Sequence, residues 1–98
     1  MLKKQYLKGR PSCKVTFSLD KGTGASSAAL VGDFNAWNTG ATPMQALKDG
    51  RFKVVIELDT DKAYEFRYLL DEGQWINEAE ADAYAPNPFA GENSVVKV

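Results

Sequence analysis

Two tryptophans, one arginine and two amides are the side chains in this sequence best suited to bind a ligand. The flat face of an indole can stack on the apolar C–H face of a pyranose, and the hydroxyls of a sugar need both donors and acceptors. Arginine, glutamine and asparagine supply those groups. The residues are Trp37, Arg67, Gln74, Trp75 and Asn93. Their types predict a platform that binds carbohydrate.

The local pattern around these residues favours exposure. The alternation of residues 64–70 turns Arg67 outward, and Trp75 follows in a short strand that can pair beside it. Trp37 lies in the polar segment 33–40, whose neighbours cannot bury a ring on all sides. The competing interpretation places the indoles in the core and leaves Arg67 as an ordinary solvated residue.

Other chemistries lack the residues they need. The sequence has no histidine, which excludes a Ser-His-Asp triad, a Cys-His pair and histidine-ligated zinc. Cys13 is the single cysteine and lies among alternating apolar residues, so we expect a buried, inert thiol. Residues 59–61 begin like a calcium loop but lack the later glycine and glutamate of an EF-hand. We therefore expect neither a cofactor nor a metal.

Five carboxylates could in principle form the acid and the nucleophile of a glycosidase. A catalytic acid needs an enclosing pocket, and these residues are expected in polar turns of a domain too small for a deep cleft. We therefore interpret them as solvated loop residues and predict that the protein is not an enzyme. They are Asp71, Glu72, Glu78, Glu80 and Asp82.

The elements that must position the ligand-binding residues are β-strands. Apolar and polar residues alternate in short blocks separated by turn residues, and the Asp49-Gly50 pair before residues 52–58 predicts a type I′ hairpin. Residues 77–83 lack a helical stripe and are expected to form a loop, whereas Phe34 is expected to face the core. About seven strands predict an all-β, immunoglobulin-like sandwich. Its expected core residues are Val15, Phe17, Leu30, Phe52, Val54, Ile56, Phe66, Tyr68 and Val96.

Length and charge set the organisation of the chain. Its 98 residues are enough for one small domain, and we assign residues 1–12 to a basic N-terminal arm and residues 13–98 to a single β-sandwich. The net charge of −1 lacks the excess of positive charge that is typical of nucleic-acid-binding domains. No apolar segment is long enough for a membrane span or a signal peptide, and the lone cysteine fits a reducing compartment, so we expect a cytoplasmic protein.

Four motifs follow one another along the chain. They are G-x-F-N-x-W at 32–37, aromatic-Arg-aromatic at 66–68, Gln-Trp at 74–75 and Asn-Ser-Val at 93–95. Together they resemble the family 48 carbohydrate-binding module, which includes the isoamylase N-terminal early-set domain and the glycogen-binding domain of the AMP-activated kinase β subunit. The resemblance implies an early-set β-sandwich that binds α-1,4-linked glucans such as glycogen, starch or maltooligosaccharides without catalysis.

The same resemblance implies roles for individual residues. Trp37 and Trp75 match the stacking tryptophans of the family, and Asn93 matches the asparagine that binds sugar hydroxyls. Arg67 takes the place where glycogen-binding members often have lysine. Phe89 falls where such members place an apolar loop residue that contacts the sugar chain.

An accessory role is the alternative. Many early-set domains of starch-debranching and branching enzymes have lost sugar binding and support a catalytic barrel. No barrel follows in this sequence and both tryptophans are kept, so binding is favoured. The alternative is a protein-interaction or structural accessory module that docks onto glycogen-metabolising enzymes, such as glycoside hydrolases, or onto another copy of the chain.

Overall fold

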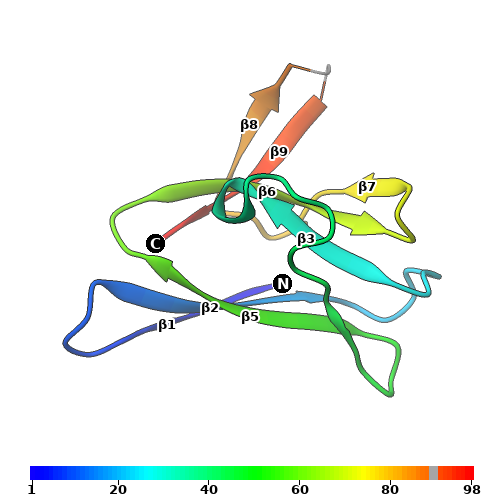
Figure 1. Ribbon diagram of the computed structural model, residues 1–98, viewed down its shortest axis with the longest axis horizontal. Helices are drawn as coiled ribbons and strands as arrows, with labels where there is room; N and C mark the ends of the chain where they lie inside the picture. Colours follow the sequence, from blue (N-terminus) through cyan, green and yellow to red (C-terminus); the bar gives the residue numbers. More distant parts are fainter. Residues whose placement is uncertain (89–90) are drawn as a thin grey trace.

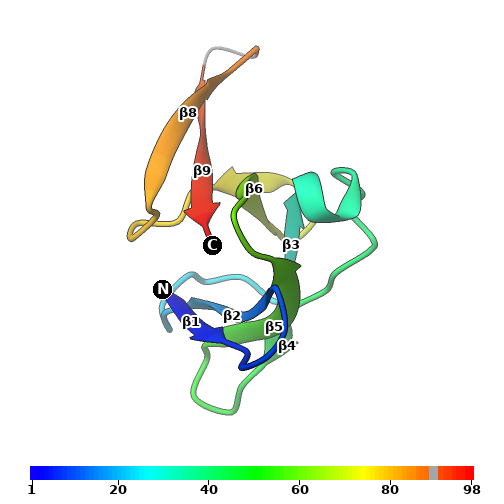
Figure 2. The same cartoon turned by 90° about the vertical axis from the view of Figure 1, so that its left-hand side faces the viewer.

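The computed structural model describes residues 1–88 and 91–98 of the chain. Within these residues, nine strands form two antiparallel sheets that pack against each other as a sandwich (Figures 1 and 2). A short 3-10 turn, η1 (Asp33–Asn35), follows the third strand. The predicted all-β, immunoglobulin-like fold is confirmed, with nine strands rather than about seven.

The first sheet has the strand order β1-β2-β5-β4. Its strands are β1 (Leu2–Tyr6), β2 (Ser12–Leu19), β5 (Phe52–Asp59) and β4 (Gln45–Ala46). The segment assigned to an N-terminal arm contributes β1, which pairs with β2. This strand was not predicted from the sequence, because Lys3, Lys4 and Gln5 form no apolar alternation and are held extended by pairing with the neighbouring strand.

The second sheet has the strand order β3-β6-β9-β8, and β7 pairs with β6. Its strands are β3 (Ala28–Gly32), β6 (Ala63–Leu70), β9 (Gly91–Lys97), β8 (Ala83–Asn87) and β7 (Gln74–Ile76). Figures 1 and 2 show β8 and β9 as a hairpin that extends away from the rest of the sandwich. The central strand β6 pairs with three strands of this sheet, β3, β7 and β9.

Aromatic rings fill the centre of the core. The ring centroids of Phe17 and Phe66 lie 5.0 Å apart, and those of Phe66 and Tyr68 lie 5.7 Å apart, both edge to face. The residues predicted for the core are buried, except that Val54 and Ile56 are partly buried against it. Phe34 and the thiol of Cys13 were also placed correctly, since Phe34 packs against the core and Cys13 is buried.

The turn between β4 and β5 differs from the predicted type I′ turn. That type needs a positive φ at both central residues, whereas Gly50 (φ 93°) has a positive φ and Asp49 does not. The N–H of Gly50 donates to the carbonyl of Leu47, and the carboxylate of Asp49 accepts the N–H of Arg51 at 3.1 Å. The prediction was wrong because the side chain of Asp49 caps the turn and leaves the left-handed position to the glycine.

Glu78 is a larger correction, because it is 2% exposed and not a solvated loop residue. Its carboxylate accepts the hydroxyl of Tyr68 at 2.7 Å and the backbone N–H of Glu80 at 2.8 Å, and the α-ammonium of Met1 lies 2.6 Å away. Its own N–H donates to the hydroxyl of Ser94 at 2.8 Å. These bonds satisfy the buried charge and hold the loop before β8 against the sandwich. The other four carboxylates of this group are exposed, as predicted.

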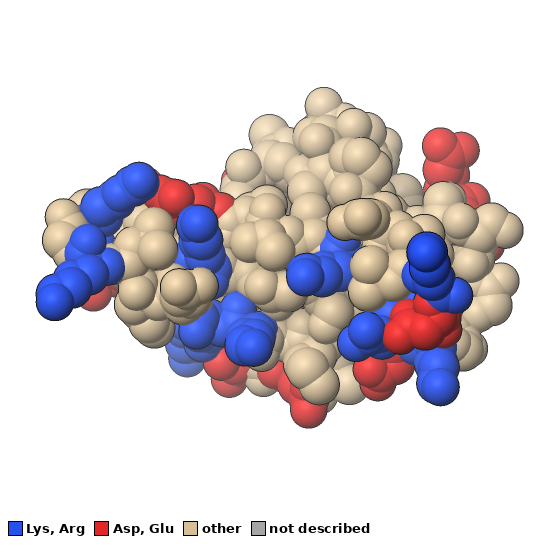
Figure 3. Space-filling view, turned by 90° about the horizontal axis from the view of Figure 1, so that it is seen from below, with Lys and Arg blue, Asp and Glu red and all other residues tan. Residues whose placement is uncertain are grey.

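Charged side chains are scattered over the outer face of the first sheet. In the view from below, lysines and arginines are spread across a largely uncharged face, with aspartates and glutamates among them (Figure 3). Lys3, Lys14 and Lys53 are exposed on β1, β2 and β5, and Val55 among them is 47% exposed. In the described part of the chain, no helix has the length and apolar character needed to cross a membrane.

The Tyr68–Glu78 pair predicts a loss of stability at alkaline pH. Burial and the neighbouring carboxylate of Glu78 raise the pKa of Tyr68 well above its ordinary value of 10.0. The stabilisation from the neutral tyrosine is therefore complete below about pH 10 and is lost as the pH rises above it, because only the unfolded tyrosine ionises there.

We expect the free energy of unfolding, measured by urea titration, to decrease above about pH 10. Tyr68→Phe should weaken this decrease while costing about 1–3 kcal/mol at neutral pH, because the buried carboxylate loses a donor. An unchanged alkaline decrease in Tyr68→Phe would assign it to other groups.

Candidate functional site

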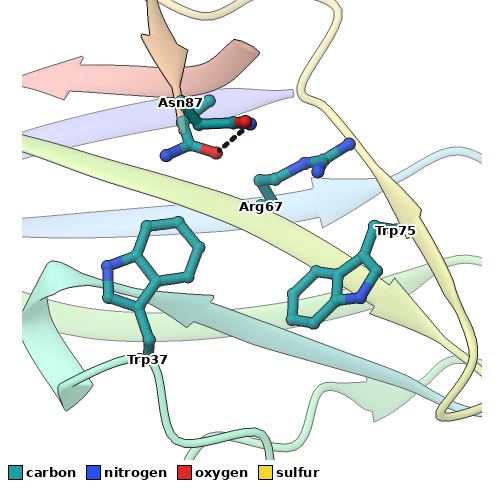
Figure 4. Close-up of a pocket in the computed structure, with 5 residues that line it drawn as sticks. Trp37, Arg67, Trp75 and Asn87 are labelled. Carbon is teal, nitrogen blue, oxygen red and sulfur yellow. Dashed lines mark hydrogen bonds between the residues drawn. The ribbon is translucent and has the colours of Figure 1, made fainter. Parts of the chain in front are cut away.

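A cavity of about 460 Å³ lies on the side of β6 that faces away from the core (Figure 4). The described residues that line it are Trp37, Arg67, Trp75, Asn87 and Asn93. The structure thus brings together four of the residues that the sequence predicted as ligand-binding. Two indoles and three nitrogen-bearing polar side chains give this cavity an apolar wall and hydrogen-bonding groups.

The cavity opens where β6 changes its partner. Phe66 pairs with Ser94 of β9, whereas Tyr68 pairs with Ile76 of β7. Arg67 lies between them and pairs with Val31 of β3 on the opposite edge only. Because β7 and the hairpin of β8 and β9 diverge from this point, the outward side chain of Arg67 lies at the bottom of the space between them (Figure 4).

The turn after β3 places Trp37. Ala36 and Trp37 both have a φ of 57°, and the N–H of Trp37 donates to the carbonyl of Gly32 at 2.9 Å. The side chain of Asn35 closes the same turn, because it accepts the N–H of Gly32 at 3.1 Å and donates to the carbonyl of Leu30 at 3.0 Å. The indole of Trp37 remains half-buried, and its Nε1–H donates to the carboxylate of Asp33 at 2.8 Å.

Gly32 lets this turn lie directly on β6. A Cβ at this position would lie 2.5 Å from the carbonyl oxygen of Glu65 and 2.7 Å from the Cβ of Phe66. No side chain fits there without moving the strand. The glycine of the G-x-F-N-x-W motif, Gly32, therefore allows the turn to pack closely on β6. Phe34 of the same motif packs against the core, and Trp37 lines the cavity.

Trp75 forms the opposite wall of the cavity. It lies on β7 opposite Leu69 and is 39% exposed. Gln74 precedes it on the same short strand and is exposed, but it does not line the cavity, because successive side chains of a strand point to opposite faces. Phe89 lies outside the described residues.

Arg67 is a half-buried cation without a carboxylate partner in the part of the chain that the structure describes. Its Nε atom is buried and has no hydrogen-bond partner among these residues. A buried donor without an acceptor is energetically costly, and because this atom has no accessible surface, a ligand can reach the guanidinium only through its other nitrogens.

Asn93 is held by a chain of side-chain hydrogen bonds. Its Nδ2 donates to the carboxylate of Glu65 at 3.1 Å, and its Oδ1 accepts Nδ2 of Asn87 at 3.3 Å. These bonds fix the orientation of the amide toward the cavity. Each group of the Asn93 amide keeps capacity for one further bond to a ligand.

Three residues at the site were not predicted from the sequence: Asp33, Glu65 and Asn87. Asp33 and Glu65 do not line the cavity but accept hydrogen bonds from Trp37 and Asn93, which do. Asn87 joins the cavity because the hairpin brings β8 beside β9, where Asn87 pairs with Gly91. The sequence signal that could have found Asn87 is a second asparagine six residues before Asn93, had the two segments been paired as a hairpin.

An immunoglobulin-like sandwich with an open, tryptophan-lined cavity defines the class of small binding modules. The family model of carbohydrate-binding module 48 (isoamylase N-terminal domain) matches residues 14–85, and the chain belongs to this family. It is thus a carbohydrate-binding domain of a non-catalytic family. The match includes Trp37, Arg67 and Trp75 and ends before Asn87 and Asn93. No curated protein matches the sequence significantly.

The packing of Gly32 gives a prediction for the loop that carries Trp37. Gly32→Ala should lower the free energy of unfolding by about 1–3 kcal/mol, because the new methyl group overlaps backbone and side-chain atoms of β6. Thermal unfolding and urea titration measure this change. Gly40→Ala is the control in the same loop, because its Cβ would lie at an ordinary 3.6 Å from Asn38. Equal stability of the two variants would contradict the close approach.

Proposed function

We propose that this domain binds α-1,4-linked glucans, such as glycogen, starch and maltooligosaccharides, in the cavity between Trp37 and Trp75. The indoles stack on sugar rings of one glucan chain, and Arg67, Asn87 and Asn93 bind its hydroxyls. Gln74 and Phe89 remain predictions from the sequence: Gln74 does not line the cavity, and Phe89 lies outside the described residues. The observation that supports this proposal most directly is the pair of indoles on opposite walls of one cavity, with Arg67 between them (Figure 4).

The arrangement of the rings suits a curved chain of sugars. In Figure 4 the six-membered rings of both indoles point toward the space between them, and Arg67 lines the same cavity. The α-1,4 linkage curves a glucan, so two rings on separate walls can contact successive sugars. Little of the ligand is enclosed in such an open site, and we expect dissociation constants of about micromolar to millimolar.

The second candidate function is protein interaction, and the outer face of the first sheet favours it. By the strand register, Lys3, Lys14 and Lys53 share the outward face of β1, β2 and β5 with the exposed Val55, and Glu57 lies on the same face opposite Lys14. An apolar centre with a charged rim is typical of protein interfaces. The partner would be an acidic protein such as a glycogen-metabolising enzyme. We also propose that the protein is located in the cytoplasm and that residues 1–12 form an N-terminal arm to the domain of residues 13–98.

Substitution of either tryptophan tests the glucan site. Trp37→Ala or Trp75→Ala should remove measurable binding of maltoheptaose in calorimetry and abolish retardation in gels that contain glycogen. Each lost ring costs about 1–3 kcal/mol, by analogy with stacking on nucleic-acid bases. Because both rings are partly exposed, the melting temperature should fall only slightly.

Tyr6→Ala is the matched control for this experiment. Tyr6 is an exposed aromatic residue on β1 of the first sheet, 58% accessible, and its loss should leave glucan binding unchanged. Unretarded migration of the unsubstituted protein in glycogen gels would instead favour the protein-interaction candidate. A tryptophan variant that unfolds would assign that indole to the core.

We also expect the protein to leave its ligand intact. Glycoside hydrolysis needs two carboxyl groups on either side of the scissile bond, and no carboxylate lines the described part of the cavity. Purified protein should release no reducing sugar from maltoheptaose, glycogen or starch during prolonged incubation. If the protein releases reducing sugar, and this release disappears when Glu65, whose carboxylate is bonded to Asn93, is replaced in Glu65→Gln, the protein is an enzyme.

A further inference from the structure

We propose that Asp33 is a positioning residue of the glucan site, which orients the indole of Trp37; this role rests on the proposed function. One oxygen of its carboxylate accepts Nε1–H of Trp37 at 2.8 Å. The other oxygen accepts the backbone N–H of Glu65 on β6, also at 2.8 Å. The carboxylate therefore ties the indole to the central strand of the sheet below the cavity.

The bond to Asp33 is the one hydrogen bond that the ring of Trp37 makes among the described residues. Ala36 and Trp37 form a left-handed turn that holds the backbone, but the ring itself is only half-buried. An indole has a single hydrogen-bond donor, and Asp33 takes it. Figure 4 shows the consequence, since the nitrogen of Trp37 lies on the side away from Trp75 and the six-membered ring points into the cavity.

Trp75 offers an internal comparison. Its indole N–H has no hydrogen-bond partner among the residues that the structure describes, and the ring is 39% exposed. Trp75 is therefore the adjustable wall of the cavity, with a donor left for a sugar hydroxyl. Trp37 is the fixed wall, and it contributes its ring face alone. A ring that is already oriented loses less conformational entropy when the ligand stacks on it.

Asp33→Asn tests this role. An asparagine offers one acceptor oxygen in place of two, so either the indole or the backbone N–H faces an amide donor instead. We expect maltoheptaose to bind about tenfold more weakly in calorimetry, as follows from the loss of one charge-assisted bond. In 1H–15N NMR spectra, the indole N–H of Trp37 should exchange faster with solvent, whereas that of Trp75 should not change.

Asp71→Asn is the matched control. The carboxylate of Asp71 also accepts two N–H groups, those of Ser26 and Ser27 at 2.8 and 3.0 Å, but it does not line the cavity. This variant removes the same charge, and because both N–H groups donate to the single oxygen Oδ1, the amide of asparagine can keep both bonds. Affinity and indole exchange should match those of the unsubstituted protein, and an equal loss in both variants would overturn the role of Asp33.

A double-mutant cycle separates positioning from general support of the loop. Trp37→Phe removes the donor, so Asp33→Asn should weaken binding less than twofold further in that background. Full additivity of the two losses would overturn the proposal. If Asp33→Asn does not fold, the unsubstituted protein decides: its Trp37 indole N–H, bonded to Asp33, should exchange with solvent more slowly than that of Trp75, and equal exchange overturns the proposal.

The NMR measurement keeps this inference distinct from the proposed function. If the unsubstituted protein binds no glucan, the proposed function fails, and the exchange of the Trp37 indole N–H still decides whether Asp33 orients the ring. Faster exchange in Asp33→Asn alone supports the positioning role. Unchanged exchange in that variant overturns it, whatever the affinity for maltoheptaose.

Discussion

The alternation of side chains along β6 is the constraint on which both the core and the candidate site depend. Phe66 and Tyr68 point inward and are fully buried, so Glu65 and Arg67 must point outward. A shift of one residue in the register of β6 would exchange these sets and bury the arginine in the aromatic core. The hydrophobic packing that determines the fold therefore also determines which polar side chains reach the cavity.

The loops depend on β6 in the same way. The turn that carries Trp37 lies against this strand because Gly32 permits close contact, and Asp33 accepts the N–H of Glu65. On the other side, Asn93 of β9 donates to the carboxylate of Glu65. Residues from two distant segments thus meet at one strand, and the cavity keeps its shape without a large core of its own.

The sequence predicted the features that follow from local periodicity and from motifs. Alternation was sufficient to place Phe17, Phe66 and Tyr68 in the core, and the four motifs indicated the family. It could not predict β1, because Lys3 to Gln5 carry no apolar alternation and become a strand only through pairing with β2. Burial of Glu78 was also missed, since its hydrogen-bond partners Tyr68 and Ser94 are brought to it by the fold.

In the candidate site, too, the cavity-lining side chains could be predicted from the sequence, whereas the residues that hydrogen-bond to them could not. Residue chemistry selects Trp37, Arg67 and Trp75, because indole faces and a guanidinium are rare and informative groups. The carboxylates of Asp33 and Glu65 are common groups, and only hydrogen bonds across the fold distinguish them from solvated acids. Neither carboxylate forms an ion pair with Arg67 among the described residues, so the guanidinium keeps donors for a ligand. An open site can bind a neutral, hydroxyl-rich ligand when the acidic groups beneath it are hydrogen-bonded within the fold and a nearby cation has no carboxylate partner.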